Sequence, residues 1–276
     1  MLQDTAALKI SDLGELSGKL LVFGGAYSNL QALEALRQRA EKHQIQPENV
    51  LCTGDVVAYC ADPEACVEFV KDWGISVLAG NCERNLAEDA DDCGCGFQPD
   101  MACSLLARSW YAHAQSQTSD ASKRWMGTLP NRIVFMHNGK RYALIHGGTR
   151  DISKFIWPTT SDAEITEELG VLKDQVGAVD VVLSGHSGIA MRRICRNVEW
   201  VNAGVIGMPD NTGVRHTCYA VINQDIAFHN LEYDWKTAQQ RMRQAGLDQG
   251  YDQTLETGFW PSEDVLPTEM RVQKSV

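Results

Sequence analysis

The chain has 276 residues, of which 44% are hydrophobic and 22% charged, and this composition excludes collagen-like, coiled-coil and wholly disordered proteins. Lysine and arginine number 25 against 36 aspartate and glutamate residues, which gives a net charge of −11. Because nucleic-acid backbones and anionic membranes attract basic surfaces, we expect neither as a partner. A small phosphorylated substrate held by a metal ion is compatible with this charge.

Charged side chains interrupt the first twenty residues at Asp4, Lys9, Asp12, Glu15 and Lys19. No signal peptide or membrane span is therefore predicted there, and we expect a cytoplasmic protein. The nine cysteines are an odd number. In a cytoplasmic chain we expect reduced thiols, some of them metal ligands, rather than a framework of disulfides.

Strands and helices alternate at the start of the chain. Short apolar runs that end in glycine predict buried strands over 19–24, 49–54 and 75–80. Helical spacing predicts helices between them, over 30–43 and 63–73. The second helix has Asp62 as its expected N-cap and Pro63 at its first position. This alternation predicts parallel pairing of the three strands.

The second half of the chain changes to hairpins. Two apolar runs, 132–137 and 141–146, flank Asn138 and Gly139, a pair typical of a type I′ turn. Further strands are predicted over 180–185 and 200–204, and short strands fill much of the region from Met191 to Tyr233. Parallel units followed by hairpins predict an α/β fold in which helices flank a sandwich of mixed sheets.

No linker rich in Pro, Ser or Gly divides the sequence, so we expect a single domain over 1–276. Two stretches depart from the alternation. Residues 84–130 contain several cysteines and a predicted helix over 101–113, and their place after Asn81 suggests an inserted cap or lid. Residues 246–276 form a polar C-terminal extension that either wraps the body or makes a homo-oligomer contact.

The candidate chemistry lies directly after the predicted strands, where ligands bind in open α/β sheets. The segments there are Gly54-Asp55, Gly80-Asn81-Cys82-Glu83, His146-Gly147 and Gly185-His186. They bring one carboxylate, one amide and two imidazoles to one rim of the sheet. Oxygen and nitrogen donors without a thiolate favour Mn, Fe, Zn or Ni over Ca.

In these segments the chain resembles the calcineurin-like metallophosphoesterases, from about Lys19 to Tyr233. Asn202-Ala203-Gly204 follows where small family members carry Asn-Pro-Gly, and Tyr59 and Pro63 are similar to the small bacterial phosphodiesterase branch. The resemblance implies a four-layer αββα sandwich of two mixed sheets flanked by helices. It also implies a dinuclear metal centre that hydrolyses phosphate mono- or diesters.

Three positions depart from the family pattern. Gly25 and Tyr27 stand where the family has the ligands of its first Asp-x-His block, and Gly188 replaces the last histidine. According to the resemblance these three belong to one metal site, whereas Asp55, Asn81, His146 and His186 make up the other. We therefore expect an altered centre with one ion, and a second ion only if other residues replace the lost ligands.

Tyr27 is one candidate replacement, because a phenolate is a ligand for ferric iron in some proteins; the alternative is an aromatic side chain packed at a strand end. Cys93 and Cys95 are the second candidate, since a Cys-x-Cys pair can bind Zn or Fe. Cys82 stands where the family has a catalytic histidine, and we count it with the candidate catalytic residues.

Four further residues lie close to these segments. Arg84 and Arg150 are within reach of a phosphate bound at the rim, and the alternative is solvated surface arginine. Glu83 is either an acid or base or an exposed turn carboxylate. Among the seven tryptophans, we expect only Trp157 near a pocket.

These observations favour a metal-dependent phosphoesterase with an altered centre. A first alternative is a catalytically inactive binding or regulatory protein with the same fold. A second alternative is an iron or redox sensor that uses Tyr27 and the cysteines.

Overall fold

The computed structural model describes residues 8–96 and 102–272, and its framework is two β-sheets. The larger has six strands in the order β1-β5-β6-β7-β9-β8, and the smaller has five in the order β11-β10-β2-β3-β4. Parallel and antiparallel pairs occur in both sheets. The predicted α/β fold with two mixed sheets is therefore confirmed.

The strands are β1 (Ile10–Glu15), β2 (Leu20–Phe23), β3 (Val50–Cys52), β4 (Ser76–Val77), β5 (Arg132–His137), β6 (Lys140–Leu144), β7 (Val181–Ser184), β8 (Met191–Cys195), β9 (Val198–Asn202), β10 (Thr217–Ile222) and β11 (Ile226–Leu231). The α-helices are α1 (Leu30–Lys42), α2 (Pro63–Trp73), α3 (Asn81–Ala87), α4 (Ala102–Gln117), α5 (Asp120–Met126), α6 (Asp162–Val176), α7 (Trp235–Gln244) and α8 (Tyr251–Thr257). Two short 3-10 helices lie at Pro47–Asn49 and Thr268–Met270.

The side chains of the central strands alternate between two cores. Leu20 and Val22 of β2 point between the sheets, where they pack with Phe135 and Leu183 of the larger sheet. Their neighbours Leu21 and Phe23 point the other way, toward the helices. Because successive strand residues face opposite sides, a strand buried on both faces is apolar throughout. This explains why the strand predicted over 19–24 contains the uninterrupted apolar run Leu20–Phe23.

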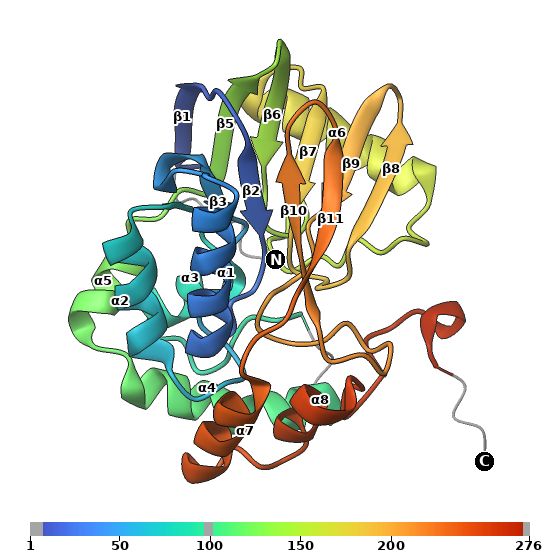
Figure 1. The fold of residues 1–276 in the computed structure, drawn as a ribbon. Helices are drawn as coiled ribbons and strands as arrows, with labels where there is room; N and C mark the ends of the chain where they lie inside the picture. Colours follow the sequence, from blue (N-terminus) through green and yellow to red (C-terminus); the bar gives the residue numbers. More distant parts are fainter. Residues whose placement is uncertain (1–7, 97–101, 273–276) are drawn as a thin grey trace.

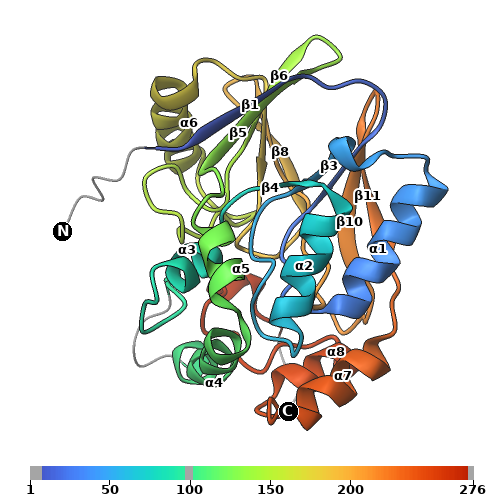
Figure 2. The same ribbon diagram turned by 90° about the vertical axis from the view of Figure 1, so that its left-hand side faces the viewer.

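Helices cover both outer faces, which gives four layers (Figures 1 and 2). α1 and α2 lie against the smaller sheet, where Leu33, Leu36 and Val67 contribute to the core. α6 lies against the larger sheet through Ile165 and Leu172. α4, α7 and α8 lie below the edge to which the arrow of β2 points (Figure 1).

Most of the predicted local elements are confirmed. β2, β3 and β4 pair in parallel, and α2 spans the predicted 63–73. The hairpin β5–β6 is antiparallel, with positive φ at both Asn138 and Gly139 as a type I′ turn requires. Asp62 is the N-cap residue of α2 as predicted, but its side chain makes no cap hydrogen bond and instead accepts from Arg241 of α7.

The C-terminal extension packs on the body. The indole Nε1 of Trp260 donates to the Pro209 carbonyl at 2.7 Å, and the backbone N–H of Trp260 donates to Asn211 at 2.8 Å. α8 packs against α7, where Gln239 donates to the Asp252 carbonyl. Up to residue 272 this segment therefore packs on the body, and the homo-oligomer contact stays a prediction. Within 8–96 and 102–272, none of the helices combines the length and apolar character needed to cross a bilayer.

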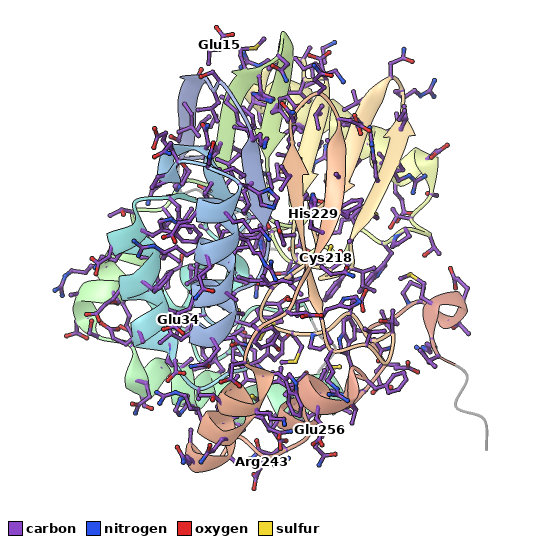
Figure 3. The ribbon with its side chains drawn as sticks, in the orientation of Figure 1. Glu15, Glu34, Cys218, His229, Arg243 and Glu256 are labelled. Atoms are coloured by element: carbon purple, nitrogen blue, oxygen red, sulfur yellow. A yellow bond between two sulfur atoms is a disulfide. The ribbon has the colours of Figure 1, made fainter. Side chains whose placement is uncertain are left out.

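Several charged side chains lie on the outside of this framework. Glu15, Glu34, Arg243 and Glu256, labelled in Figure 3, are all exposed. His229, also labelled there, lies on β11 and packs its ring on Tyr219 at 5.4 Å between centroids.

Phe135 tests the core between the sheets, because its ring is 1% exposed and stacks on Tyr142 at 4.9 Å. We expect Phe135→Ala to lower the free energy of unfolding by about 3–5 kcal/mol through lost burial and the cavity left behind. Urea denaturation measures this. Phe228→Ala is the matched control, since this ring on β11 is 39% exposed, and a loss below ~1 kcal/mol is expected. Equal losses would contradict the assignment of this core.

Candidate metal centre

Four loops that follow strands bring four polar side chains together. Asp55 follows β3, and Asn81 opens α3 after β4. His146 follows β6, and His186 follows β7. Ligand atoms of Asp55, His146 and His186 all lie within 4.8 Å of one another, so each could reach one shared cation.

His146 is at the centre of this cluster. Its Nε2 lies 3.0 Å from Oδ1 of Asn81, 3.3 Å from Oδ2 of Asp55 and 3.2 Å from Nδ1 of His186. Its other ring nitrogen, Nδ1, lies 2.7 Å from the carbonyl oxygen of Thr53. Because a carbonyl only accepts hydrogen bonds, Nδ1 carries the proton and Nε2 presents its lone pair when the ring is neutral.

The atoms around Nε2 are therefore mostly acceptors. Asp55 contributes a carboxylate oxygen and Asn81 an amide oxygen, because the Asn81 amide nitrogen donates to the Cys93 carbonyl at 2.9 Å. The two oxygen atoms at 3.0 and 3.3 Å from Nε2 present electron pairs that repel its lone pair unless a proton or a cation lies between them. This donor set of nitrogen and oxygen fits a transition-metal ion.

Burial and mutual charge shift the pKa values of these groups. Burial disfavours the charged form of His146, but the Asp55 carboxylate outweighs it and raises the pKa of His146. Burial likewise opposes ionisation of Asp55, yet the two histidines lower its pKa overall. Burial and the neighbouring His146 lower the pKa of His186 to about 3. His186 is therefore neutral, as a metal ligand must be.

Two of these residues have unusual backbones. Asp55 has φ 57° and His186 has φ 60°, a left-handed conformation that costs energy for residues other than glycine. Gly54 must be glycine, since a Cβ there would lie 2.6 Å from the Gly80 nitrogen and 2.8 Å from Nδ1 of His146. Such strain is concentrated at functional sites, where surrounding contacts hold it in place.

Glu83 supplies those contacts. Its carboxylate accepts hydrogen bonds from the backbone N–H groups of Asp55, Gly80 and Val57 at 2.8, 2.9 and 3.1 Å. The side chain is fully buried; burial and the nearby Asp55 raise the pKa of Glu83 to about 7 against the effect of its three donors. The exposed-carboxylate alternative is therefore wrong, and Glu83 positions the Asp55 loop.

Cys82 lies beside the cluster but is buried. Its backbone N–H donates to Oδ1 of Asp55 at 3.4 Å, and burial with the Asp55 charge raises the pKa of its thiol well above the usual value. A thiol kept protonated is a poor nucleophile and a poor metal ligand. Cys82 therefore lies next to Asp55, one of the candidate ligands.

The Cys93-Gly94-Cys95 turn covers Asn81 from the other side. The two cysteines form a disulfide, whereas the other seven cysteines are free. The expectation of reduced thiols is therefore wrong for this pair, and neither sulfur can act as a thiolate ligand while the bond is intact. The turn instead orients Asn81, whose amide also approaches the Cys95 sulfur at 3.4 Å.

The three positions that depart from the family pattern lie together. A Cβ on Gly25 would lie 2.5 Å from the Tyr27 ring, and one on Gly188 would lie 3.6 Å from the Tyr27 hydroxyl. The ring of Tyr27 thus extends between the two glycines. Burial and the nearby Asp55 raise the pKa of Tyr27 well above its usual value, which favours the neutral phenol over a phenolate ligand.

Neither of the two arginines lines the cavity beside the cluster. Arg84 lies on α3 and forms an ion pair with Glu88. Arg150 is exposed in the loop after β6.

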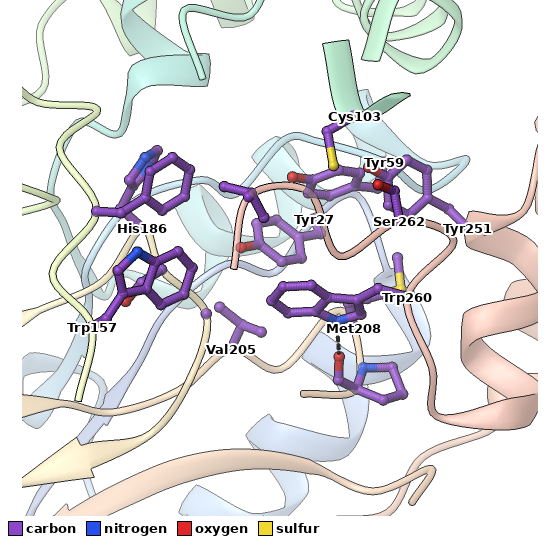
Figure 4. A pocket seen from close by; sticks show the side chains of 15 residues that line it. Tyr27, Tyr59, Cys103, Trp157, His186, Val205, Met208, Tyr251, Trp260 and Ser262 are labelled. Carbon is purple, nitrogen blue, oxygen red and sulfur yellow. Dashed lines mark hydrogen bonds between the residues drawn. The ribbon is translucent and has the colours of Figure 1, made fainter. Parts of the chain in front are cut away.

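Aromatic side chains form much of the lining of the cavity beside His186 (Figure 4). It has about 520 Å³ of empty space, including the space at its mouth that is open to solvent. Trp157 and His186 lie at one end and Tyr251 and Ser262 at the other, with Trp260 between them. The expectation that Trp157 lies near a pocket agrees with this arrangement, and the exclusion of the other tryptophans is wrong because Trp260 also lines it.

Several lining residues were not predicted from the sequence. Phe155 stacks on Trp157 with centroids 5.0 Å apart and contacts His186 at 4.3 Å. The aromatic pair Phe155-x-Trp157 lies shortly after the His146 segment, and this pattern in the sequence could have identified Phe155 as a lining residue. Trp260 has no comparable signal, since it comes from the C-terminal extension with no candidate segment near it in sequence.

The chain matches the sequence model of a known family and the sequence of a related protein. The model of the calcineurin-like phosphoesterase superfamily domain matches residues 19–225. An uncharacterized protein of Methanocaldococcus jannaschii, MJ0912, is 22% identical over 244 residues, which are 81% of this chain and 91% of that protein.

Two solved structures are similar in fold. A metallophosphoesterase from Sphaerobacter thermophilus has a TM-score of 0.67 and 21% identity, and the match covers 88% of this chain and 100% of that one. The hypothetical protein PH1004 from Pyrococcus horikoshii has a TM-score of 0.71 and 15% identity, covering 87% and 98%.

Glu83→Gln tests how the Asp55 loop is held. An amide keeps one acceptor oxygen but turns an NH₂ group toward a backbone donor, so we expect the free energy of unfolding to fall by about 1–3 kcal/mol. We expect affinity for Mn²⁺ to fall about 10- to 100-fold, as for other residues that orient ligands. Denaturation and calorimetric titration measure the two effects.

Glu88→Gln is the matched control, because Glu88 ends the same helix and its side chain is 63% exposed. It should change the free energy of unfolding by less than ~1 kcal/mol and leave Mn²⁺ affinity unchanged. If the two variants behave alike, Glu83 does not position the loop.

Proposed function

Because the chain belongs to the calcineurin-like phosphoesterase superfamily, we propose that it is a metal-dependent hydrolase of phosphate mono- or diesters that works with a single ion. The ion is Mn, Fe, Zn or Ni, given the nitrogen and oxygen donors. Its ligands are Asp55, Asn81, His146 and His186. The convergence of acceptor atoms on Nε2 of His146 is the observation that carries this proposal.

When bound, such an ion polarises the phosphoryl group and lowers the pKa of a coordinated water to ~7. Other groups of the chain orient the proposed ligands. The Thr53 carbonyl fixes the tautomer of His146, and the Cys93 carbonyl turns the Asn81 oxygen toward the centre. Glu83 holds Asp55 in its strained backbone conformation.

The proposal of one ion rests on the substituted positions. A second ion would need ligands where Gly25 and Gly188 have no side chain, and the Tyr27 ring occupies the space between them. The Tyr27 hydroxyl extends toward the His186 end of the cavity (Figure 4). As a neutral phenol it can donate a hydrogen bond to an oxygen of a bound ester.

The segment over 84–130 contributes to the same region in this proposal. Its disulfide-bonded turn contacts Asn81, and Cys103 of α4 lines the cavity. We propose that it acts as a cap over the bound ester.

Asp55→Asn tests the proposed centre. Loss of the carboxylate charge should lower the content of Mn, Fe, Zn or Ni from about one ion per chain to well below, and should lower kcat/KM for p-nitrophenyl and bis-p-nitrophenyl phosphate at least ~100-fold. Elemental analysis and a colorimetric assay measure these. His229→Gln, a substitution of a histidine packed on Tyr219, should retain both properties.

Metal bound at full content without turnover of either ester would contradict hydrolysis and favour the inactive binding protein. Retention of metal in Asp55→Asn would contradict the ligand assignment itself.

Tyr27→Phe distinguishes a packed phenol from an iron ligand. Because the raised pKa of Tyr27 favours the neutral form, we expect iron-loaded wild type to show no visible tyrosinate absorption band, and the variant to bind the same amount of metal. Tyr59→Phe is the matched control, since Tyr59 packs on Tyr27 at 4.8 Å between centroids. A visible band that disappears in Tyr27→Phe and persists in Tyr59→Phe would support the iron-sensor alternative.

A further inference from the structure

The cavity beside the candidate centre has a chemical character of its own. Six aromatic side chains line it besides His186: Tyr27, Tyr59, Phe155, Trp157, Tyr251 and Trp260. No Asp, Glu, Lys or Arg is found among the described residues that line it. A charged or strongly hydrated group would lose its water in such a cavity without gaining a charged partner.

The cavity adjoins the candidate centre through one shared residue, His186. His186 both lines it and offers a ligand atom within 4.8 Å of those of Asp55 and His146. A phosphoryl group held at the centre would therefore present one of its ester substituents to the aromatic walls. A phosphoester that fills both regions needs an anionic group at one end and an uncharged group beside it.

The walls suit a flat ring. Phe155 and Trp157, which both line the cavity, are parallel to within 2°, and aromatic side chains of this kind favour contact with another ring. Trp260 faces the cavity from the C-terminal extension, where its indole N–H is already used in the bond to Pro209 (Figure 4). Its ring is therefore held in place before any ligand binds.

A few polar groups lie among these rings. The hydroxyls of Tyr27 and Ser262 line the cavity, whereas that of Ser187 already donates to the Ile156 carbonyl at 3.0 Å. A mostly apolar cavity with a few hydrogen-bonding groups is typical of sites for small organic ligands.

Building on the proposed function, we propose that this cavity binds an uncharged planar aromatic group attached to the scissile phosphate. The chain would then act on phosphoesters that carry such a ring, and sugar phosphates without one would bind weakly. Two kinds of compound supply this chemistry, namely a nucleotide through its base and an aryl phosphate through its phenyl ring.

The test compares ligands with and without the ring on the full chain. Calorimetry gives affinities of the Mn²⁺-loaded protein for adenosine 5′-monophosphate, phenyl phosphate and ribose 5-phosphate. Saturation-transfer NMR on the metal-free protein compares adenosine with ribose, which have no phosphate. We expect at least one ring-bearing phosphate to bind about 10-fold or more tightly than ribose 5-phosphate, as stacking on aromatic side chains provides.

Three variants locate the effect. Trp260→Ala should lose the preference for the ring and keep the affinity for ribose 5-phosphate, whereas Trp260→Phe, which retains a ring, should keep most of the preference. Phe259→Ala is the matched control, since Phe259 is adjacent in sequence, 41% exposed and outside the cavity. Circular dichroism confirms that each variant is folded.

Each outcome decides the proposal. Equal affinity for ring-bearing and ringless phosphates, or a preference that survives Trp260→Ala, overturns it. Preference for the nucleotide alone, or for phenyl phosphate alone, supports it and identifies the source of the ring. If the protein binds adenosine but hydrolyses no ester, the proposal of a ring-binding cavity stands and the proposed hydrolase function fails. If it hydrolyses esters without preferring a ring, the hydrolase function stands and the ring-binding proposal fails.

Discussion

The hydrogen bond from Nδ1 of His146 to the Thr53 carbonyl, 2.7 Å long, determines what the rest of the site can be. It fixes the proton on one side of the ring and turns the lone pair of Nε2 toward Asp55 and Asn81. Without a proton or cation between them, these groups would repel one another in a buried region. This bond therefore leaves a cluster that a proton on Nε2 or a bound cation can hold together.

Neighbouring contacts maintain the arrangement. Three backbone N–H groups converge on the buried carboxylate of Glu83, so the loops after β3 and β4 are held together with Asp55 in its left-handed conformation. The turn that contains the disulfide fixes the amide of Asn81. His186 also lines the aromatic cavity, so that the candidate ion site and the proposed organic-ligand site share one residue.

The sequence was informative about the fold and the four candidate ligands because both depend on local pattern. A glycine and a polar residue after each buried strand predict one rim, and the structure brings Asp55, Asn81, His146 and His186 together there. The features that could not be predicted from the sequence depend on contacts between segments that are distant along the chain. Trp260 reaches the cavity from the far end of the chain, and the state of Cys93 and Cys95 depends on how a short turn folds over Asn81. The sequence leaves Glu83 either an acid or base or an exposed turn carboxylate, because its burial and its three backbone donors depend on how the loops after β3 and β4 pack together.

Anomalous diffraction from crystals grown with Mn²⁺ locates each ion relative to the side chains, and so tests most directly whether the four candidate ligands bind one cation. We expect a single anomalous peak within bonding distance of Asp55, Asn81, His146 and His186, and none between Gly25 and Gly188. A peak elsewhere, two peaks at the centre, or none at saturating Mn²⁺ would contradict it.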